Sequence, residues 1–306
     1  MRRADRMEGS SSHLPFRSVV LLVRQSLGFD LAILGISALP LRWRVTFLFQ
    51  KFAVLCQLAS GRFPVMSVGA LRFHVDSFSS LGTLQSNIVD FYREVVRPDL
   101  LNQSQPTVLD IGANVGQFCL AVKLFYPFAT VVSFEADPRT FEMLYRNTGH
   151  IAGVTPHNVA LGSKDEERTF FRHSVSGMSS FRPYPGHSYS GADGEITLAT
   201  RRLDGILEDE LVWDLVKIDV EGYELEVLNG ATAVLRSALL LLVEIRLASS
   251  LESRSNLDLF NAISRIFPQA RLVRCGRPLG PARRPVSQDL LFDLSQRDPP
   301  LPHDDR

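Results

Sequence analysis

Short apolar segments alternate with helix-like segments along most of the chain, and this alternation constrains the fold more than any other feature. The apolar segments carry few charges, which indicates a parallel sheet that is covered on both faces. Strands that alternate with helices form βαβ units. The predicted strands are residues 107–111, 130–135, 154–160, 211–218, 239–245, 270–275 and 289–294, and the predicted helices are residues 115–125, 139–147, 223–235 and 257–267.

The last two predicted strands are joined by a loop without a helix. Neighbouring parallel strands need a long crossover, so these two strands are predicted to be antiparallel. Upstream of the sheet, the sequence predicts a short strand pair at 65–75 and a helix over 86–96. The stretch rich in Pro, Gly and Ser at 182–195 is predicted to be a loop.

The first sixty residues differ from this pattern. From residue 16 to residue 62 the chain has six basic residues and one acidic residue, and helices there are expected to break at Gly35 and Pro40. We expect this segment to pack on the rest of the chain with its arginines at the surface; weak attraction to an anionic membrane is the alternative. The predicted parts are a disordered tail (1–15), an N-terminal helical extension (16–62), one α/β domain (63–294) and a loose C-terminal tail (295–306).

The stretch VLDIGANVGQF at residues 108–118 forms the turn between the first strand of the alternation and its helix. Ligands of open α/β sheets bind at such strand ends, and glycines let the backbone approach a ligand closely. The turn lacks the lysine of a P-loop and two of the three glycines of a dinucleotide fingerprint. Asp110 disfavours an anion, so a ligand with a cationic end, such as S-adenosylmethionine (SAM), fits better. Asp110, Gly112, Asn114 and Gly116 are therefore predicted to bind the cofactor.

A second acidic residue ends the next predicted strand, in SFEADP. Glu135 lies nineteen residues after Gly116 (135 − 116). An acid at this position accepts hydrogen bonds from ribose hydroxyls in NAD and SAM enzymes alike. Glu135 and Ala136 are thus predicted to contact an adenosine ligand, and Asn158 and Val159, at the end of the third strand, are expected beside its adenine.

The composition narrows the range of partners. The 33 Lys and Arg residues balance the 33 Asp and Glu residues, which argues against general nucleic-acid binding, because such binding needs excess positive charge. The three cysteines are far apart and form neither a zinc pattern nor a disulfide framework, so a reducing compartment is expected. The sequence shows no convincing secretory signal or membrane-spanning segment. The sequence therefore predicts a cytoplasmic protein. It does not predict the oligomeric state.

The order of the motifs resembles the FkbM-type SAM-dependent methyltransferases. The motifs are VLDIGANVGQF, SFEADP, NVALG, GMSSF, ATRRLD and LVKIDVEGYELEVLNGA, and the resemblance runs from about residue 63 to residue 294. It implies a class I methyltransferase fold: a Rossmann-like three-layer sandwich with a mostly parallel sheet and an antiparallel C-terminal hairpin. It further implies methyl transfer from SAM, usually to a hydroxyl oxygen of a small molecule or sugar, and places Ser180 near the cofactor. The chain departs slightly from the family in reading FEADP where the family often reads FEP.

An alcohol acceptor must lose its proton, so a proton acceptor is expected at the carboxyl edge of the sheet. The predicted catalytic residues are Asp219 and Glu221, which follow the strand at 211–218, and His173, which precedes GMSSF. Asp219 is alternatively a helix N-cap, and Glu221 alternatively complements the helix N-terminus. We assign no metal site, although Asp219, Glu221 and Glu244 would suit magnesium if they converged.

Two other classes of function stay open. One is a non-catalytic SAM-binding or scaffolding protein of the same fold, which the intact glycines and acids disfavour. The other is an NAD-dependent oxidoreductase, which the missing glycines disfavour. The favoured function is O-methylation of a sugar or a polyketide-like small molecule, with a small-molecule or glycan acceptor as partner and no nucleic acid.

Overall fold

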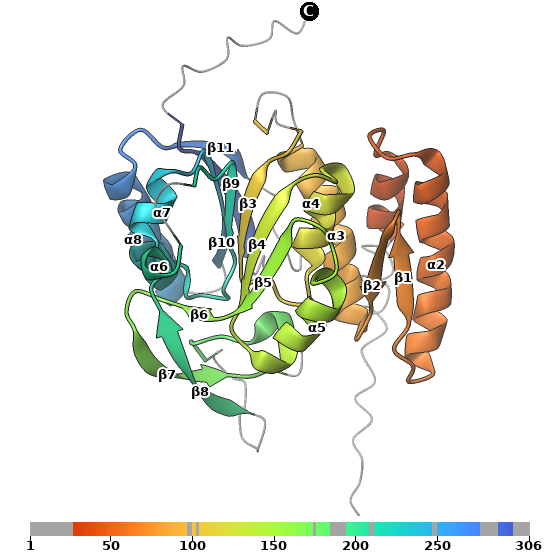
Figure 1. Cartoon of the computed structure of the whole chain (residues 1–306), viewed down its shortest axis with the longest axis horizontal. Helices are drawn as coiled ribbons and strands as arrows, with labels where there is room; N and C mark the ends of the chain where they lie inside the picture. The colour runs from red at the N-terminus through yellow and green to blue at the C-terminus, as the bar shows by residue number, and fades with distance from the viewer. Residues whose placement is uncertain are drawn as a thin grey trace, which may run out of the picture.

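The computed structural model describes residues 27–96, 100–101, 104–173, 176–183, 194–207, 211–246, 250–275 and 287–295. Its centre is a seven-stranded sheet with helices on both faces (Figure 1). The predicted disordered tail at 1–15 lies outside the described residues, as does all but the first residue of the predicted C-terminal tail. No described helix is long and apolar enough to cross a bilayer.

The order of the strands confirms the predicted class I methyltransferase fold. Five neighbouring strands are parallel, and β12 is antiparallel to both β10 and β11, as predicted for the last two strands. In spatial order the strands are β11 (Arg271–Cys275), β12 (Ser287–Asp293), β10 (Leu240–Arg246), β9 (Leu215–Ile218), β3 (Thr107–Ile111), β4 (Thr130–Glu135) and β5 (Val154–Asn158).

Side chains that alternate along the central strands feed two separate cores. Val108 and Leu215 belong to one buried cluster, while their chain neighbours Leu109 and Val216 belong to the cluster on the opposite face. This alternation follows from the period of two along a strand. The first face is covered by α3 (Phe78–Glu94), α4 (Gln117–Phe125) and α5 (Pro138–Thr148), and the second by α6 (Glu224–Gly230), α7 (Thr232–Arg236) and α8 (Ser250–Ile266) (Figure 1).

Several boundaries differ from the predictions for local reasons. Helix α3 begins at Phe78, eight residues before the predicted helix, because the Ser77 hydroxyl accepts a hydrogen bond from the Ser80 amide in a capping box. The predicted helix 223–235 is two helices, α6 and α7, which meet at Ala231.

A second small sheet was not predicted from the sequence. The predicted strand at 154–160 ends at Asn158, and the chain then enters a three-stranded sheet of order β6-β8-β7. Its two longer strands, at residues 166–171 and 195–201, are largely exposed, so they lack the apolar runs that mark the central sheet. The three strands are β6 (Ala160–Leu161), β7 (Glu166–Phe171) and β8 (Glu195–Arg201), and short 3₁₀ turns lie at η1 (Ser176–Met178) and η2 (Leu203–Gly205).

The N-terminal segment lies on the α3 side of the sheet. Residues 27–34 are helical, and α2 (Leu41–Ala59) begins after Pro40, so the helices break where predicted. The hairpin of β1 (Val65–Val68) and β2 (Leu71–His74) lies between α2 and the domain (Figure 1). Ile33, Ile36, Leu39, Phe47 and Val54 share the buried cluster that contains α3 and α4.

A polar contact buried at the same junction joins three helices. Lys51 Nζ lies 2.6 Å from Asp30 Oδ1, and Gln85 Nε2 donates to the same oxygen at 2.9 Å. The ion pair and the hydrogen bond satisfy groups that would be costly to bury alone. The N-terminal segment therefore contacts α3 through both apolar and polar groups. The predicted bounds of the α/β domain, residues 63–294, stay a prediction.

Two phenylalanines two residues apart on α2 test this packing. Phe47 is 4% exposed and Phe49 is 75% exposed. We expect Phe47→Ala to lower the free energy of unfolding by about 3–5 kcal/mol, because it leaves a cavity in the shared core. The matched control, Phe49→Ala, should change it by less than about 0.5 kcal/mol. Denaturant unfolding of both variants measures the difference, and equal effects would contradict the packing.

Candidate active site

A cavity of about 240 Å³ lies at the carboxyl ends of the central strands. The turn after β3, the end of β4 and the loop after β9 form one part of its wall, and α3 forms another. The fold therefore brings most of the predicted site residues to one place. Those that line the cavity are Gly112, Asn114, Glu135, Ala136, Val159, Asp219, Glu221 and Glu244.

Gly112 is required where the turn after β3 meets the end of β9. Its φ is +82°, and a Cβ atom there would lie 1.8 Å from the carbonyl oxygen of Asp219. Its amide donates to Phe134 O at 3.0 Å, which fixes the turn against β4. Only glycine accepts both this left-handed conformation and this close approach.

The second glycine of the turn packs closely against a neighbouring helix. Gly116 has a φ of +96° and caps α4, and a Cβ atom there would lie 2.7 Å from Thr148 Cγ2 and 3.2 Å from Leu144 Cδ1. Both of these residues belong to α5. The close approach at Gly116 is thus to a neighbouring helix, and among the described residues it does not line the cavity.

Glu135 is held at the end of β4 by backbone groups. Its Oε2 accepts from the Asn114 amide and its Oε1 from the Asp137 amide, both at 2.9 Å. Burial raises the pKa of Glu135 to about 7, although these two amides lower it. Asn158 does not line the described cavity; its Nδ2 donates to the backbone oxygens of Glu135 and Ala136, at 2.9 and 3.2 Å.

Lys217 is a buried cation between two strands of the site. It is the register partner of Asp110, and its Nζ lies 3.0 Å from Asp219 Oδ2 and 3.6 Å from Asp110 Oδ1. Burial lowers the pKa of Lys217, but Asp219 and Asp110 raise it and outweigh burial, so the ammonium stays charged. Asp110 is fully buried and lies outside the described lining of the cavity, and burial raises its pKa to about 6. The structure thus places Asp110 against Lys217.

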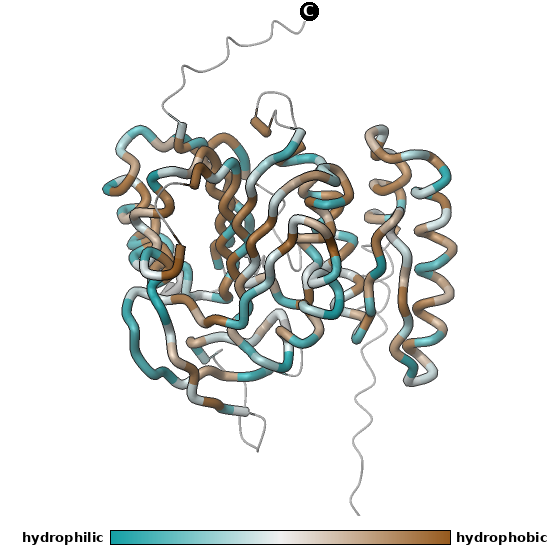
Figure 2. The backbone as a smooth tube through the Cα atoms, viewed as in Figure 1, coloured by the Kyte–Doolittle hydropathy of each residue, from teal (hydrophilic) through white to brown (hydrophobic). Residues whose placement is uncertain are grey.

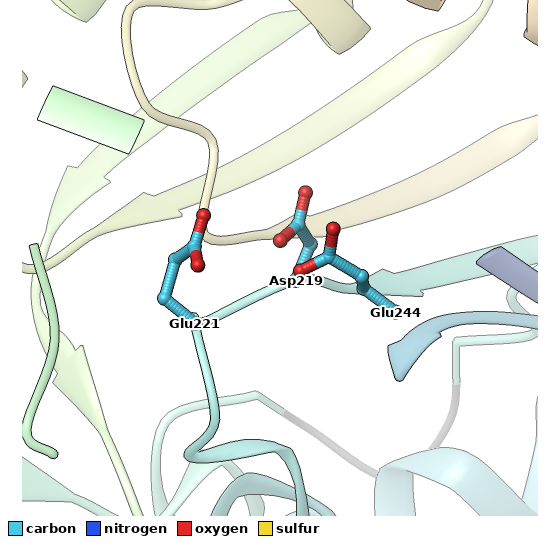
Figure 3. Close-up of side chains that lie close together, drawn as sticks. All are labelled: Asp219, Glu221 and Glu244. Atoms are coloured by element: carbon cyan, nitrogen blue, oxygen red, sulfur yellow. The ribbon is translucent and has the colours of Figure 1, made fainter. Parts of the chain in front are cut away.

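Three carboxyl groups converge at the strand ends, as the magnesium alternative required. Asp219, Glu221 and Glu244 each offer an oxygen, and these atoms lie within 4.8 Å of one another (Figure 3). Glu221 is also held by Arg246, whose Nη2 lies 2.9 Å from its Oε2. Lys217 and Arg246 therefore balance two of the three negative charges.

The helix-cap alternative for Asp219 is wrong. Helix α6 begins at Glu224 with Tyr223 at its N-cap, and no side chain caps it. Glu224 instead accepts from the amides of Val220 and Gly222, at 3.2 and 2.8 Å. Asp219 is therefore left facing the cavity, and Glu221 precedes the helix.

Two predicted residues lie behind the wall of the cavity. Ser180 is buried, and its hydroxyl donates to Glu221 O at 2.6 Å. Ser179 lines the cavity, and its Oγ accepts from the backbone amide of His173 at 2.9 Å. His173 itself does not line the described cavity, so the structure does not bring it beside Asp219 there.

The sequence analysis missed the wall formed by α3. Its residues follow a helical spacing of i, i+3, i+4, i+7 and i+11, which the sequence contains but which the late start predicted for this helix obscured. They are Thr83, Ser86, Asn87, Asp90 and Glu94. Asp289 on β12 was also missed; burial, and to a lesser degree Asp219, raise its pKa to about 7.

A family of known proteins matches the part of the chain that carries most of this site. The methyltransferase FkbM domain matches residues 110–269, which include the turn after β3 and the loop after β9. The chain belongs to the FkbM methyltransferase family. It is thus a methyltransferase, and α2, the first hairpin and α3 lie outside the matched region.

Two relatives have names that refer to a sugar acid or to methylation on oxygen. The hexuronic acid methyltransferase AglP of Haloferax volcanii is 32% identical over 184 residues, which cover 58% of this chain and 70% of the relative. The 2-O-methyltransferase NoeI of Sinorhizobium fredii is 28% identical over 161 residues, covering 47% and 64%.

The chain also resembles solved methyltransferase structures at low identity. TYW2 of M. jannaschii, solved with AdoMet, has a TM-score of 0.43 and 11% identity, and the match covers 76% of this chain and 84% of that one. The fold of the FkbM methyltransferase described here rests on its own strand order rather than on this likeness.

Gly112→Ala should disrupt the site by pushing the β3 turn away from β9. We expect it to lower the free energy of unfolding by about 3 kcal/mol or more, since strain at positive φ and overpacking add. Gly82→Ala is the matched control: nothing lies within 4 Å of its added methyl group in α3, so it should stabilise by about 0.5–1 kcal/mol. Chemical denaturation measures both. A Gly112→Ala enzyme as stable as wild type would contradict the close approach.

Proposed function

We propose that the enzyme transfers the methyl group of SAM to a hydroxyl oxygen of a sugar or another polyhydroxylated small molecule. The observation that carries the proposal is the shared cavity, in which five of the nine predicted cofactor residues and a hydrogen-bonding helix face one space. Glu135 is suited to accept hydrogen bonds from the ribose hydroxyls of an adenosine ligand. Val159 and Phe134 offer an apolar wall for its adenine.

The charge of the cavity supports a cationic methyl donor. Opposite charges attract most strongly where water is partly excluded, so an acidic wall favours a sulfonium and an ammonium over a pyrophosphate. The same excess of acidic side chains disfavours the pyrophosphate of NAD. Seven acidic side chains and one basic side chain line the described part of the cavity: Asp90, Glu94, Glu135, Asp219, Glu221, Glu244 and Asp289 against Lys217.

The polar face of α3 supports a hydroxylated acceptor. Thr83, Ser86 and Asn87 offer hydroxyl and amide groups, and Asp90 and Glu94 offer carboxylates, all toward the same cavity. Such groups pair with the several hydroxyls of a sugar. The names of AglP and NoeI point to acceptors of this kind for those relatives.

The reaction needs an in-line displacement and a proton acceptor. The acceptor oxygen forms a bond to the methyl carbon while the carbon–sulfur bond breaks, and the sulfonium becomes a neutral thioether. The hydroxyl proton passes to a carboxylate, and we assign this role to Asp219, which lines the cavity and is half-buried. Lys217, 3.0 Å away, holds the Asp219 carboxylate in place.

The pH dependence of cofactor binding tests the donor and the role of Glu135 together. Ribose hydroxyls donate to the ionised form, so SAM binding should release a proton below about pH 7, the pKa of Glu135. Affinity should rise about tenfold per pH unit up to that value and then level off. Calorimetry in buffers of different ionisation enthalpy measures both quantities.

Glu135→Gln should weaken SAM binding and flatten this pH profile. NAD, titrated separately, should not bind. Binding of NAD in place of SAM would favour the oxidoreductase alternative. Binding of SAM with a flat profile in the wild-type enzyme would remove Glu135 from the ribose site.

Asp219→Asn tests the proton acceptor, because it keeps the shape and removes the charge. The single-turnover rate with a sugar that the wild type methylates should fall by a factor of about 10²–10⁴, with little change in SAM affinity. Asp165→Asn, at an exposed carboxylate that is not among the residues lining the cavity, is the control and should leave the rate unchanged.

The same assay tests the reaction class and the metal. Methyl label should be recovered on oxygen; label on nitrogen or carbon would overturn O-methylation. Since Lys217 and Arg246 pair with two of the three converging carboxylates, we assign them no metal ion. Chelation with EDTA should leave the rate unchanged, and a loss restored by Mg²⁺ would make Asp219, Glu221 and Glu244 metal ligands instead.

A further inference from the structure

Helix α2 carries apolar side chains on two opposite faces. Phe47 and Val54 point into the shared core. Leu41, Val45, Phe49 and Phe52 are exposed, and their spacing of four, four and three residues aligns them on one side of the helix. We call these four residues the outer stripe. Helix α2 lies at the edge of the molecule, and brown segments recur along its length (Figures 1 and 2).

Exposed apolar residues are concentrated around this helix. Of the 16 large hydrophobic residues that are exposed in the described structure, eight lie between residues 27 and 65. Phe63, just after α2, is among them. Exposed apolar residues scattered singly are ordinary, but a row of them marks an interaction site. The outer stripe is therefore a candidate docking surface.

The charged residues near the outer stripe indicate the chemistry of its binding partner. Helix α2 has three basic residues and no acidic residue. Lys51 is buried against Asp30, and Arg44 donates to Leu34 O, so both are occupied on the protein side. The exposed charges that flank the stripe are Arg42 and Arg62, one near each end of α2.

A second copy of α2 has no acidic residue that could pair with these arginines. Two α2 helices packed through the outer stripe would bring arginines together without an acidic residue on either helix to pair with them. A lipid surface supplies both missing components: hydrocarbon for the apolar side chains and anionic headgroups for the arginines.

We propose that α2 docks the enzyme on an anionic lipid surface, with the outer stripe at the boundary between headgroups and acyl chains and with Arg42 and Arg62 among the headgroups. The inference is independent of the methyl acceptor, because no residue of α2 lines the described cavity.

Vesicle flotation of the full chain tests this proposal. The probes are vesicles of phosphatidylcholine alone and of phosphatidylcholine mixed with phosphatidylglycerol. The wild type should float with the mixed vesicles, and the double variant Phe49→Ser, Phe52→Ser should bind them at least about tenfold more weakly. Arg42→Gln and Arg62→Gln should each weaken binding about fivefold, with the mixed vesicles only.

A phenylalanine elsewhere on the surface provides the control. Phe128→Ser removes a side chain that is 74% exposed, close to the 75% and 72% of Phe49 and Phe52, and should leave flotation unchanged. Thermal melts of all variants should match the wild type, since none of the changed side chains is buried.

Three results would overturn the proposal. The first is a wild type that fails to float with the mixed vesicles, and the second is a double variant that binds them as the wild type does. In the third, sedimentation equilibrium would show a wild-type dimer that the double variant loses, which would assign the outer stripe to a second copy of the chain.

Discussion

The buried ammonium group of Lys217 ties together the two strands on which the site is built. It lies between Asp110 on β3 and Asp219 at the end of β9. A buried charge is tolerated only when it is paired, and removing one partner of such a pair costs about 3–5 kcal/mol. The pairing thus fixes where β9 ends relative to β3, and with it the direction in which Asp219 faces the cavity.

The rest of the site follows from this join. Gly112 lets the turn after β3 lie directly against the backbone of Asp219, so the two strand ends share one wall. Glu135 then fastens the same turn to β4 through the Asn114 amide. One set of contacts therefore both holds the sheet edge together and exposes to the cavity the carboxyl groups to which we assign donor binding and proton acceptance.

The sequence predicted the parts of the site that depend on local position. Gly112 and Asp219 each follow an apolar strand, Glu135 ends one, and parallel strands that neighbour one another bring their carboxyl ends to one edge. Strand order and register are tertiary properties, so the sequence could not predict that Lys217 lies opposite Asp110 or that Asp289 lies opposite Glu244.

The features that the sequence did not predict have similar physical causes. Gly116 has a positive φ and its missing side chain faces α5, a contact that only the packing of two helices determines. The polar residues that line the cavity from α3 have helical spacing in the sequence. They were missed because the Ser77 cap, a short polar signal, was not recognised as the start of the helix. The exposed strands β7 and β8 had too few apolar residues to stand out.

In the proposed function, one cavity holds the methyl donor against β3 and β4 and the acceptor against α3. A crystal structure of the enzyme with S-adenosylhomocysteine tests this arrangement. We expect ribose hydroxyls on the Glu135 carboxylate, adenine beside Val159, and the sulfur turned toward Asp219 and the face of α3. A ligand bound outside this cavity, or with its ribose away from Glu135, would contradict it.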